Sequence, residues 1–289
     1  YLNNMEATTE TKPKWIRVKL PTGKNYKELR GLVDKYQLNT ICQSGSCPNM
    51  GECWGEGTAT FMILGNICTR SCGFCGVKTG RPSEIDWEEP EKVARSIKLM
   101  KIKHAVLTSV DRDDLKDMGS IIWAETINAV RRISPGTTME TLIPDFQGIT
   151  KHIDRLLEAS PEVISHNMET VRRLTREVRI QAKYDRSLEV LRYMKEQGQR
   201  RTKTGIMLGL GEKPSEVYET LKEVHDAHVD VITIGQYLQP SKKHLPVKEY
   251  ISLEQFKEYE DFARSLGNFR HIESSPLVRS SYHAEKHIN

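Results

Sequence analysis

Three cysteines in one short loop are the residues of this chain whose type and spacing most directly indicate chemistry. Cys68, Cys72 and Cys75 follow the spacing C-x3-C-x2-C. A loop of this length can turn three thiolates toward one point, and soft sulfur ligands select zinc, copper(I) or iron–sulfur clusters. A closed structural zinc site takes four protein ligands, whereas three thiolates on a cluster of four irons leave one iron open to a ligand that is not protein. The loop therefore indicates either a structural thiol site or a cluster with an open iron.

A second triplet precedes the first. Cys42, Cys47 and Cys53 follow the spacing C-x4-C-x5-C, so the two triplets use all six cysteines of the chain. Three disulfides are the alternative, but a secreted disulfide framework normally belongs to a small domain with a signal peptide. A chain of 289 residues whose first residues do not have the pattern of a signal peptide fits that class poorly. We therefore expect two sites of three thiolates each.

Length and composition limit the other function classes. With 289 residues and 37% hydrophobic residues, the chain can bury the core of one large domain. The formal net charge of +4 is spread over interleaved acids and bases, so we expect no nucleic-acid partner. A mildly basic surface suits an acidic protein or an anionic cofactor. No apolar run approaches the roughly 18–20 residues that span a bilayer, so we expect no membrane association and a reducing, cytoplasmic location.

Short apolar runs alternate with helical patterns from residue 60 onward. Candidate strands cover residues 61–64, 105–110, 138–143, 163–165, 205–210 and 231–234. Candidate helices cover residues 91–100, 121–133, 153–159, 187–197 and 215–225, and a further one covers 25–36. Such alternation predicts an α/β fold with parallel strands and helical crossovers. Six units suggest a partial (β/α)6 TIM-like barrel, although the pattern alone does not separate it from an open doubly wound sheet.

Polar residues follow the candidate strands, where the functional side chains of a parallel barrel collect. Thr108, Ser109 and Asp111 end the second strand, and Asn167 and Glu169 follow the fourth. Each group also has a simpler interpretation, because acids favour helix starts and asparagine favours helix N-caps.

Two further features at the strand ends are weaker indications of a ligand-binding site. The glycines of the segment 209–211 fit either an ordinary turn or a close approach of the backbone to a ligand. His166 alone is more typical of hydrogen-bonded structure than of a metal ligand.

The sequence resembles the radical S-adenosylmethionine (SAM) enzymes, and among them the lipoyl synthase family. Phe74 stands before the last cysteine of the loop, as in the radical SAM signature. Further motifs follow in the family's order: PNMGECW at 48–54, VDRDDL at 110–115, PDF at 144–146, HNMET at 166–170, GLGE at 209–212, QYLQP at 236–240 and RSSYHA at 279–284. The resemblance covers residues from about 40 to 284.

The resemblance implies two [4Fe–4S] clusters and SAM. One cluster would be held by Cys68, Cys72 and Cys75, and its open iron would bind the amino and carboxylate groups of SAM. The residues implied to line the SAM site are Phe74, Thr108, Ser109, Asp111, Asn167 and Glu169. An auxiliary cluster would be held by Cys42, Cys47, Cys53 and a serine of the RSSY motif, which we assign to Ser280, with Ser281 as the second candidate.

The activity implied by the family is a radical SAM sulfurtransferase reaction. Two sulfur atoms enter at C6 and C8 of a protein-bound octanoyl-lysine, one SAM is used for each, and the auxiliary cluster is the sulfur donor. The implied partners are an octanoylated carrier (glycine cleavage H protein or the E2 domain of a 2-oxoacid dehydrogenase), a flavodoxin- or ferredoxin-type reductant and an iron–sulfur carrier for cluster repair. A biotin-synthase-like enzyme and a metal-binding interaction module without turnover remain as alternatives.

The same resemblance suggests how the chain is organised. We expect a disordered tail over residues 1–14, an N-terminal extension with auxiliary ligands over 15–59, the partial barrel over 60–267, and a C-terminal segment over 268–289 that closes the auxiliary site. One departure from the family lies at Ser44 and Gly45, where members commonly have Glu-Ala. The ligand spacing is unaffected, but a carboxylate near that cluster is missing.

Overall fold

The computed structural model describes residues 13–16, 27, 30, 31, 33, 40, 49–199 and 201–288. Most of the predicted tail therefore lies outside the described residues. The same is true of four residues discussed above, Cys42, Ser44, Gly45 and Cys47. Of the helix predicted over 25–36, the four described residues are helical. A short 3-10 helix, η1 (Lys14–Ile16), precedes them.

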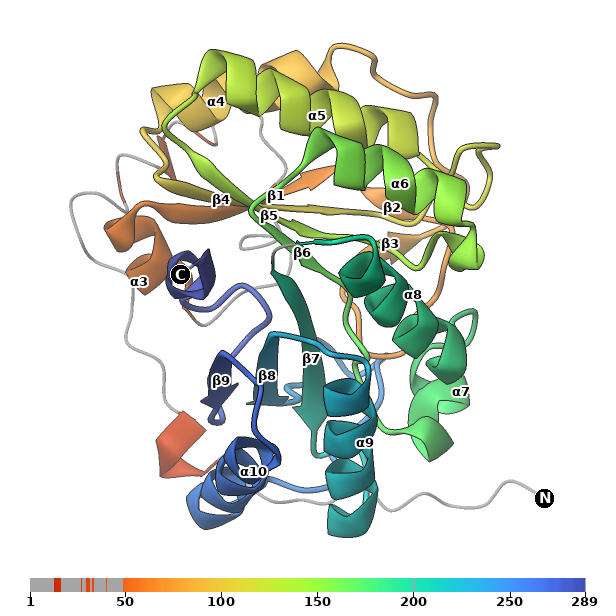
Figure 1. The fold of residues 1–289 in the computed structure, drawn as a ribbon, viewed down its shortest axis with the longest axis vertical. Coiled ribbons are helices and arrows are strands. Elements are labelled where there is room, and N and C mark those ends of the chain that lie inside the picture. Colours follow the sequence, from red (N-terminus) through yellow and green to blue (C-terminus); the bar gives the residue numbers. More distant parts are fainter. Residues whose placement is uncertain are drawn as a thin grey trace.

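Seven parallel strands form one curved sheet in the order β1-β4-β5-β6-β7-β8-β9 (Figure 1). The strands are β1 (Thr58–Ile63), β4 (His104–Ser109), β5 (Thr138–Leu142), β6 (Val163–Ser165), β7 (Thr202–Leu208), β8 (Val231–Gln236) and β9 (His271–Ser274). β1 and β8 are buried along their whole length, as expected for parallel strands covered on both faces. All six predicted strands are present, and β9 adds a seventh.

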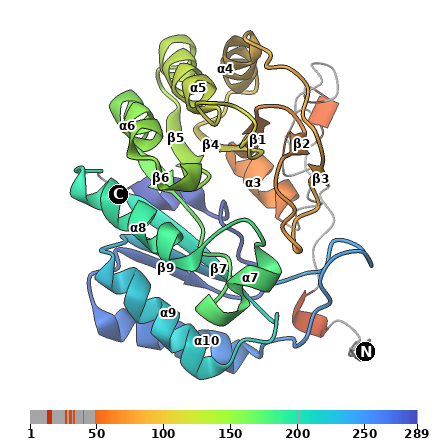
Figure 2. The same cartoon turned by 90° about the vertical axis from the view of Figure 1, so that its right-hand side faces the viewer.

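Helices cover the outer face of the sheet (Figures 1 and 2). They are α4 (Glu89–Leu99), α5 (Ser120–Ile133), α6 (Thr150–Ala159), α8 (Tyr184–Glu196), α9 (Pro214–Asp226) and α10 (Leu253–Leu266). Each turns an apolar stripe toward the strands, as Ile97, Ile127 and Leu191 do, all three fully buried. The five helices predicted for the barrel are confirmed, and α10 was not predicted. None of the helices in the described ranges is long and apolar enough to span a membrane.

Shorter elements lie in the loops at the carboxyl ends of the strands. They are β2 (Ile67–Cys68) and β3 (Lys78–Thr79), which pair with each other, and η2 (Phe146–Gly148), η3 (Arg172–Leu174) and α7 (Thr175–Val178). A last pair of elements, α3 (Met50–Glu56) and the 3-10 helix η4 (Ala284–Ile288), lies on the inner side of the curved sheet (Figure 1).

The two edge strands, β1 and β9, are bridged by η4. Thr58 of β1 donates a hydrogen bond from its hydroxyl to Glu285 Oε2 at 3.1 Å. On the other side, the rings of His271 on β9 and His287 on η4 have centroids 4.7 Å apart. The chain therefore fills the gap of the incomplete barrel with its own C-terminal residues.

Candidate active site

A cavity of about 320 Å³ lies where the strands β1, β4, β5, β6, β7 and β8 end. Its wall includes every described residue predicted for the radical SAM site, and Ser280 as well. These residues are Cys68, Cys72, Phe74, Cys75, Thr108, Ser109, Asp111, Asn167, Glu169 and Ser280. The fold thus collects side chains from residue 68 to residue 280 around one space.

The three thiols of the loop are held in a state suited to a metal. Backbone amides of Asp111 and Arg70 donate to Cys68 Sγ at 3.2 and 3.4 Å, and none of the described cysteines forms a disulfide. Burial raises the pKa of Cys68 to about 11 and that of Cys72 to about 12. As free thiols they stay protonated at neutral pH, and a bound cation is what would hold them as thiolates. The donor set therefore fits a thiolate-ligated cluster.

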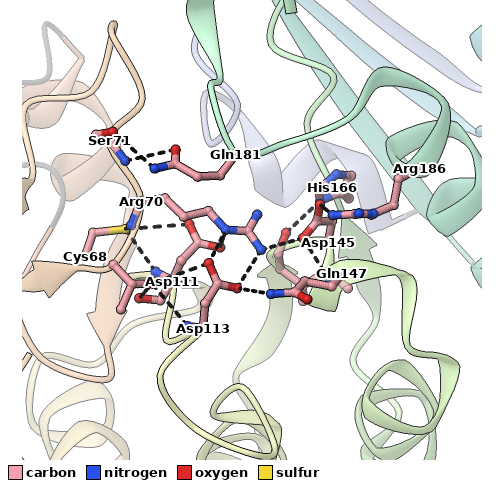
Figure 3. Close-up of polar contacts among 12 residues, drawn as sticks. Cys68, Arg70, Ser71, Asp111, Asp113, Asp145, Gln147, His166, Gln181 and Arg186 are labelled. Carbon is pink, nitrogen blue, oxygen red and sulfur yellow. Dashed lines mark hydrogen bonds and ion pairs between the residues drawn. The ribbon is translucent and has the colours of Figure 1, made fainter. Parts of the chain in front are cut away.

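Arg70, inside the signature loop (residues 66–75), attaches that loop to the barrel (Figure 3). Its guanidinium makes two hydrogen bonds to Asp113, at 2.6 and 2.8 Å. It also pairs with Asp145 at 2.8 Å and with Asp111 at 3.3 Å. Arg70 is 6% exposed and Asp145 is fully buried, so these charges interact in a weakly screened environment. One cation thus joins the loop to the ends of β4 and β5.

A second set of contacts holds the loop from the opposite side. His244 Nε2 lies 3.0 Å from the carbonyl oxygen of Cys75, and the backbone amide of Leu245 donates to the carbonyl of Gly73. The amide of Gly73 donates in turn to the carbonyl of Val178 at 2.9 Å. A Cβ on Gly73 would lie 2.9 Å from the Leu245 side chain, so the loop after β8 packs directly on the signature loop.

Polar groups facing the cavity have hydrogen-bonding capacity that protein atoms do not use. Asn167 Nδ2 donates to Glu169 Oε1 at 3.0 Å, whereas Asn167 Oδ1 and Ser109 Oγ are buried without a partner among the described residues. Burial raises the pKa of Glu169, against the opposing effect of the Arg179 charge. Such unpartnered groups are costly unless a ligand satisfies them. An amino acid amine or ribose hydroxyls would do so, and the wall therefore fits SAM.

Other residues named from the sequence have structural roles. His166 is buried between the Ile143 carbonyl and Ser187 Oγ, each at 2.9 Å, which confirms it as hydrogen-bonded structure. No helix begins at Asn167 or Asp111, so the helix-start interpretation of these residues is wrong.

The glycines at 209 and 211 are not among the residues that line the cavity. A Cβ on Gly209 would instead lie 2.2 Å from Gln236 Nε2 and 2.4 Å from the Glu249 carbonyl. Gly209 also has φ +96°, a conformation that glycine adopts most easily. These glycines therefore serve the packing of the loop after β8.

The described residues of the predicted auxiliary site come from two segments distant in sequence. Cys53 lies on α3, and Asn49 at the start of that helix donates to the carbonyl of Leu277 at 2.7 Å. The Tyr282 hydroxyl donates to Glu52 at 3.3 Å. Ser280 lines the cavity, whereas Ser281 is not among its lining residues. Thr40, close in sequence to the first auxiliary cysteine, forms a β-bridge with Phe61 on β1.

Two cations at the site were not identified from the sequence. Arg70 lies inside the recognised loop, but the cysteine spacing gives no sign that it pairs with Asp111, 41 residues further on. Arg179 follows α7 and donates to the Met168 carbonyl at 2.9 Å, and its charge opposes the rise in the pKa of Cys72. No sequence pattern marks Arg179, because its approach to the cysteines depends on the fold.

The fold and this cavity define a class, the radical SAM enzymes, and comparison with known proteins agrees. Residues 62–224 match the radical SAM superfamily. The fold is similar to that of the FeFe-hydrogenase maturase HydG from Carboxydothermus hydrogenoformans, with TM-score 0.56 and 15% identity over 91% of this chain and 77% of that one. Methylornithine synthase gives TM-score 0.55 and 14% identity, over 89% and 78% of the two chains.

Within that class the chain belongs to the lipoyl synthase family. It is 78% identical to the mitochondrial lipoyl synthase of Nematostella vectensis over 286 residues, which are 99% of this chain and 98% of that protein. It is 75% identical to the lipoyl synthase of Flavobacterium johnsoniae over 98% of each chain. The chain is thus a radical SAM enzyme whose family uses [4Fe–4S] clusters and SAM.

Proposed function

We propose that this chain inserts sulfur at C6 and C8 of an octanoyl group carried on a lysine of a partner protein. The observation that carries the proposal is that three signature thiols and Ser280 line the same cavity. A radical formed at one side of such a space could reach a substrate carbon held against the other side. Family membership supports the same reaction. When bound, SAM and its cluster supply a carbon radical that removes hydrogen, and an auxiliary cluster supplies sulfide.

In this proposal each part of the wall has a separate task. Cys68, Cys72 and Cys75 hold the first cluster, and Phe74 packs beside it. Asn167 Oδ1 would accept a hydrogen bond from the ligand, and Ser109 Oγ would donate or accept one, because protein atoms leave both unpartnered. The apolar part of the wall, which includes Met62, Ile143 and Ile206, suits an unbranched alkyl chain and excludes water from it.

Cys42, Cys47, Cys53 and Ser280 are proposed to hold the auxiliary cluster. Ser280 is favoured over Ser281 because only Ser280 belongs to the cavity wall. A serine oxygen is a hard ligand for iron beside three soft thiolates, so it suits a position from which the ligand must leave. The division at residues 15–59, 60–267 and 268–289 belongs to the same proposal, with β1 starting slightly earlier and β9 contributing to the sheet.

The experiment that tests this assignment is cluster counting by iron and sulfide analysis with Mössbauer spectra on anaerobically reconstituted protein. We expect two cubane clusters in the wild type and one in the Cys42→Ala/Cys47→Ala/Cys53→Ala variant, which should still cleave SAM. A wild type with a single cluster, or with zinc in place of iron, would exclude the sulfur-donor proposal and favour a metal-binding module.

Ser280→Ala and Ser281→Ala form a matched pair for the fourth ligand. We expect Ser280→Ala to retain SAM cleavage and to lose most product formation, with an altered auxiliary-cluster signal in the Mössbauer spectrum. Ser281→Ala should resemble the wild type in both measurements. The reverse result would transfer the role to Ser281.

The partners and the location are part of the proposal. An octanoylated carrier domain, from a glycine cleavage H protein or a 2-oxoacid dehydrogenase E2, would present the substrate. A flavodoxin- or ferredoxin-type protein would supply electrons, and an iron–sulfur carrier would rebuild the auxiliary cluster. A cytoplasmic location fits the bacterial relative, and one relative is named as mitochondrial, so cell fractionation is the measurement that decides it.

A further inference from the structure

Three side chains on the inner side of the sheet have the composition of a metal site that differs from both cysteine sites. His271 and Glu273 lie on β9, and His287 lies on η4. One ligand atom from each, a ring nitrogen or a carboxylate oxygen, lies within 4.8 Å of the others. Tetrahedral ligands about 2.0–2.1 Å from a zinc ion are about 3.4 Å from one another, so small side-chain rotations would bring these three to bonding distance.

The position of each side chain follows from the strand and the short helix that carry it. Side chains alternate along a strand, so His271 and Glu273 share one face of β9, while Ile272 between them is buried. Ser274, on the face of Ile272, donates to the Phe256 carbonyl of α10 at 2.8 Å. The His271–Glu273 face is therefore turned away from α10 and toward η4.

His287 supplies an independent indication of a missing ligand. Its side chain is 1% exposed, and both of its ring nitrogens are buried without a hydrogen-bond partner among the described residues. Burying such nitrogens without a partner is costly, and native interiors rarely tolerate it. Burial, with nearby positive charge from Lys203, lowers the pKa of His287 below its usual range. A metal ion would satisfy one of the two unpartnered ring nitrogens.

Charges of both signs lie around this cluster. Lys203 and Glu140 are both fully buried in the barrel and neutralise each other, with Nζ 2.8 Å from Oε2. Glu273 and Glu285 add two further carboxylates, and both raise the pKa of Lys203 against the dominant effect of its burial. The Lys203 charge still reaches His287, and Glu273 and Glu285 supply the negative charge that a divalent ion would need beside it.

We propose that His271, Glu273 and His287 bind a divalent first-row transition-metal ion that fastens η4 to β9. Two imidazoles and one carboxylate suit Zn²⁺ best among common ions, with Fe²⁺ as the second ion of the same chemistry. The ion would hold η4 on β9 more strongly than the present contact does, and because the site has three protein ligands, its fourth position would be taken by water. The His271–Glu273 hydrogen bond of 2.9 Å would be exchanged for coordination.

The test uses the full chain with both cysteine sites loaded, so that thiols are already occupied. Protein reconstituted anaerobically is given Zn²⁺, passed through a desalting column, and analysed for zinc, iron and sulfide. Zinc K-edge X-ray absorption then separates nitrogen and oxygen ligands, at about 2.0–2.2 Å, from thiolates at about 2.3 Å. We expect one zinc per chain with nitrogen and oxygen ligands only and an unchanged iron content. A parallel sample with Fe²⁺ tests the second ion.

His271→Gln and His287→Gln are the informative variants, and exposed His228→Gln is the matched control. Loss of one ligand should weaken zinc binding by at least about 10- to 100-fold, the range found for losing only an outer-shell partner. His228→Gln should bind zinc as the wild type does. His271 is half-buried at a sheet edge, so its variant keeps the test valid if His287→Gln fails to fold. Absence of the extra zinc, sulfur ligation of it, or equal binding by His271→Gln would each overturn the proposal.

Discussion

The signature loop and the proposed auxiliary site are built from the chain in different ways. In the loop, three cysteines come from one stretch, and Arg70 fixes that stretch to three carboxylates on two neighbouring strand ends. Around Cys53, the described groups come from segments separated by more than 200 residues: Asn49 donates to the Leu277 carbonyl, and Glu52 contacts both Tyr282 and His283. Among the described residues, which do not include Cys42 and Cys47, buried ion pairs hold the signature loop and more exposed contacts hold the region around Cys53.

This difference agrees with the tasks proposed for the two sites. A site that must generate a radical and use it on one carbon benefits from a fixed geometry, because misplacement by about 1 Å is costly. A site whose contents are removed and rebuilt benefits from an enclosure that can loosen. Four predictions test the comparison, from the largest expected effect to the smallest.

Arg70→Ala should loosen the attachment of the signature loop to the barrel. The fully buried Asp145 loses this cation but keeps Arg186 at 3.2 Å, and two further carboxylates lose their shared cation, so we expect destabilisation at the lower end of about 3–5 kcal/mol. SAM cleavage should be lost with it. Urea unfolding and a SAM-cleavage assay measure the two effects. Arg264→Ala, which breaks an exposed pair with Glu260, is the control and should cost less than about 1 kcal/mol.

Acid should weaken the same network in the wild type. Burial raises the pKa of Asp145, but the Arg70 charge, the His166 charge and the hydrogen bonds from Arg70 and the Gln147 amide together outweigh it and lower the pKa from 3.8 to about 2. A lowered carboxyl pKa contributes stability that is complete above pH 3.8 and is lost as pH falls through 2. The contribution is about 2 kcal/mol. Unfolding of cluster-free wild type and Arg70→Ala should therefore differ most near neutral pH and converge near pH 2, and a constant difference would contradict this account.

Gly235→Ala should disturb the proposed auxiliary site, although it changes none of the proposed ligands. A Cβ at this position on β8 would lie 2.2 Å from the Val278 carbonyl, so the segment that carries Ser280 must move. Overpacking of this kind costs about 1–3 kcal/mol. We expect lower auxiliary-cluster content by iron analysis with SAM cleavage retained. Gly136→Ala, where nothing lies within 4 Å of the new Cβ, should leave both unchanged.

His244→Ala should have the smallest effect. It removes one contact of 3.0 Å to the Cys75 carbonyl, while Arg70 and the backbone bonds of Gly73 still hold the loop. A single hydrogen bond contributes about 1 kcal/mol. SAM cleavage should fall by less than about tenfold, as measured by 5′-deoxyadenosine release. A loss as severe as that of Arg70→Ala would mean that the loop after β8, and not the arginine network, determines the geometry.

Sequence patterns predicted the strands and helices of the barrel because apolar periodicity is local. β9 was missed because its four residues alternate apolar Ile272 with polar neighbours in too short a run to stand out. α10 was readable from Phe256, Tyr259 and Ala263 at helical spacing, but its pattern lies beyond the sixth predicted strand.

The cysteines and the strand-end residues of the site were predicted from motifs, and the structure gathers the described ones around one cavity. Arg179 could not be predicted, because its distance to Cys72 is set by packing. The cluster of His271, Glu273 and His287 likewise has no local signature, since η4 reaches β9 only in the folded chain. The sequence therefore did not predict contacts between segments that lie far apart in the chain and meet only in the fold.

The bridging of β1 and β9 by η4 also has a consequence for protein synthesis. A nascent chain made as far as residue 145 already contains the signature loop, Arg70 and all three of its carboxylate partners. The strand β9, Ser280 and η4 are synthesised last among the described residues. Since domains are made from the N-terminus, the gap between the first and last strands stays open on the ribosome. η4 therefore cannot cover the inner side of the sheet until residue 288 has emerged.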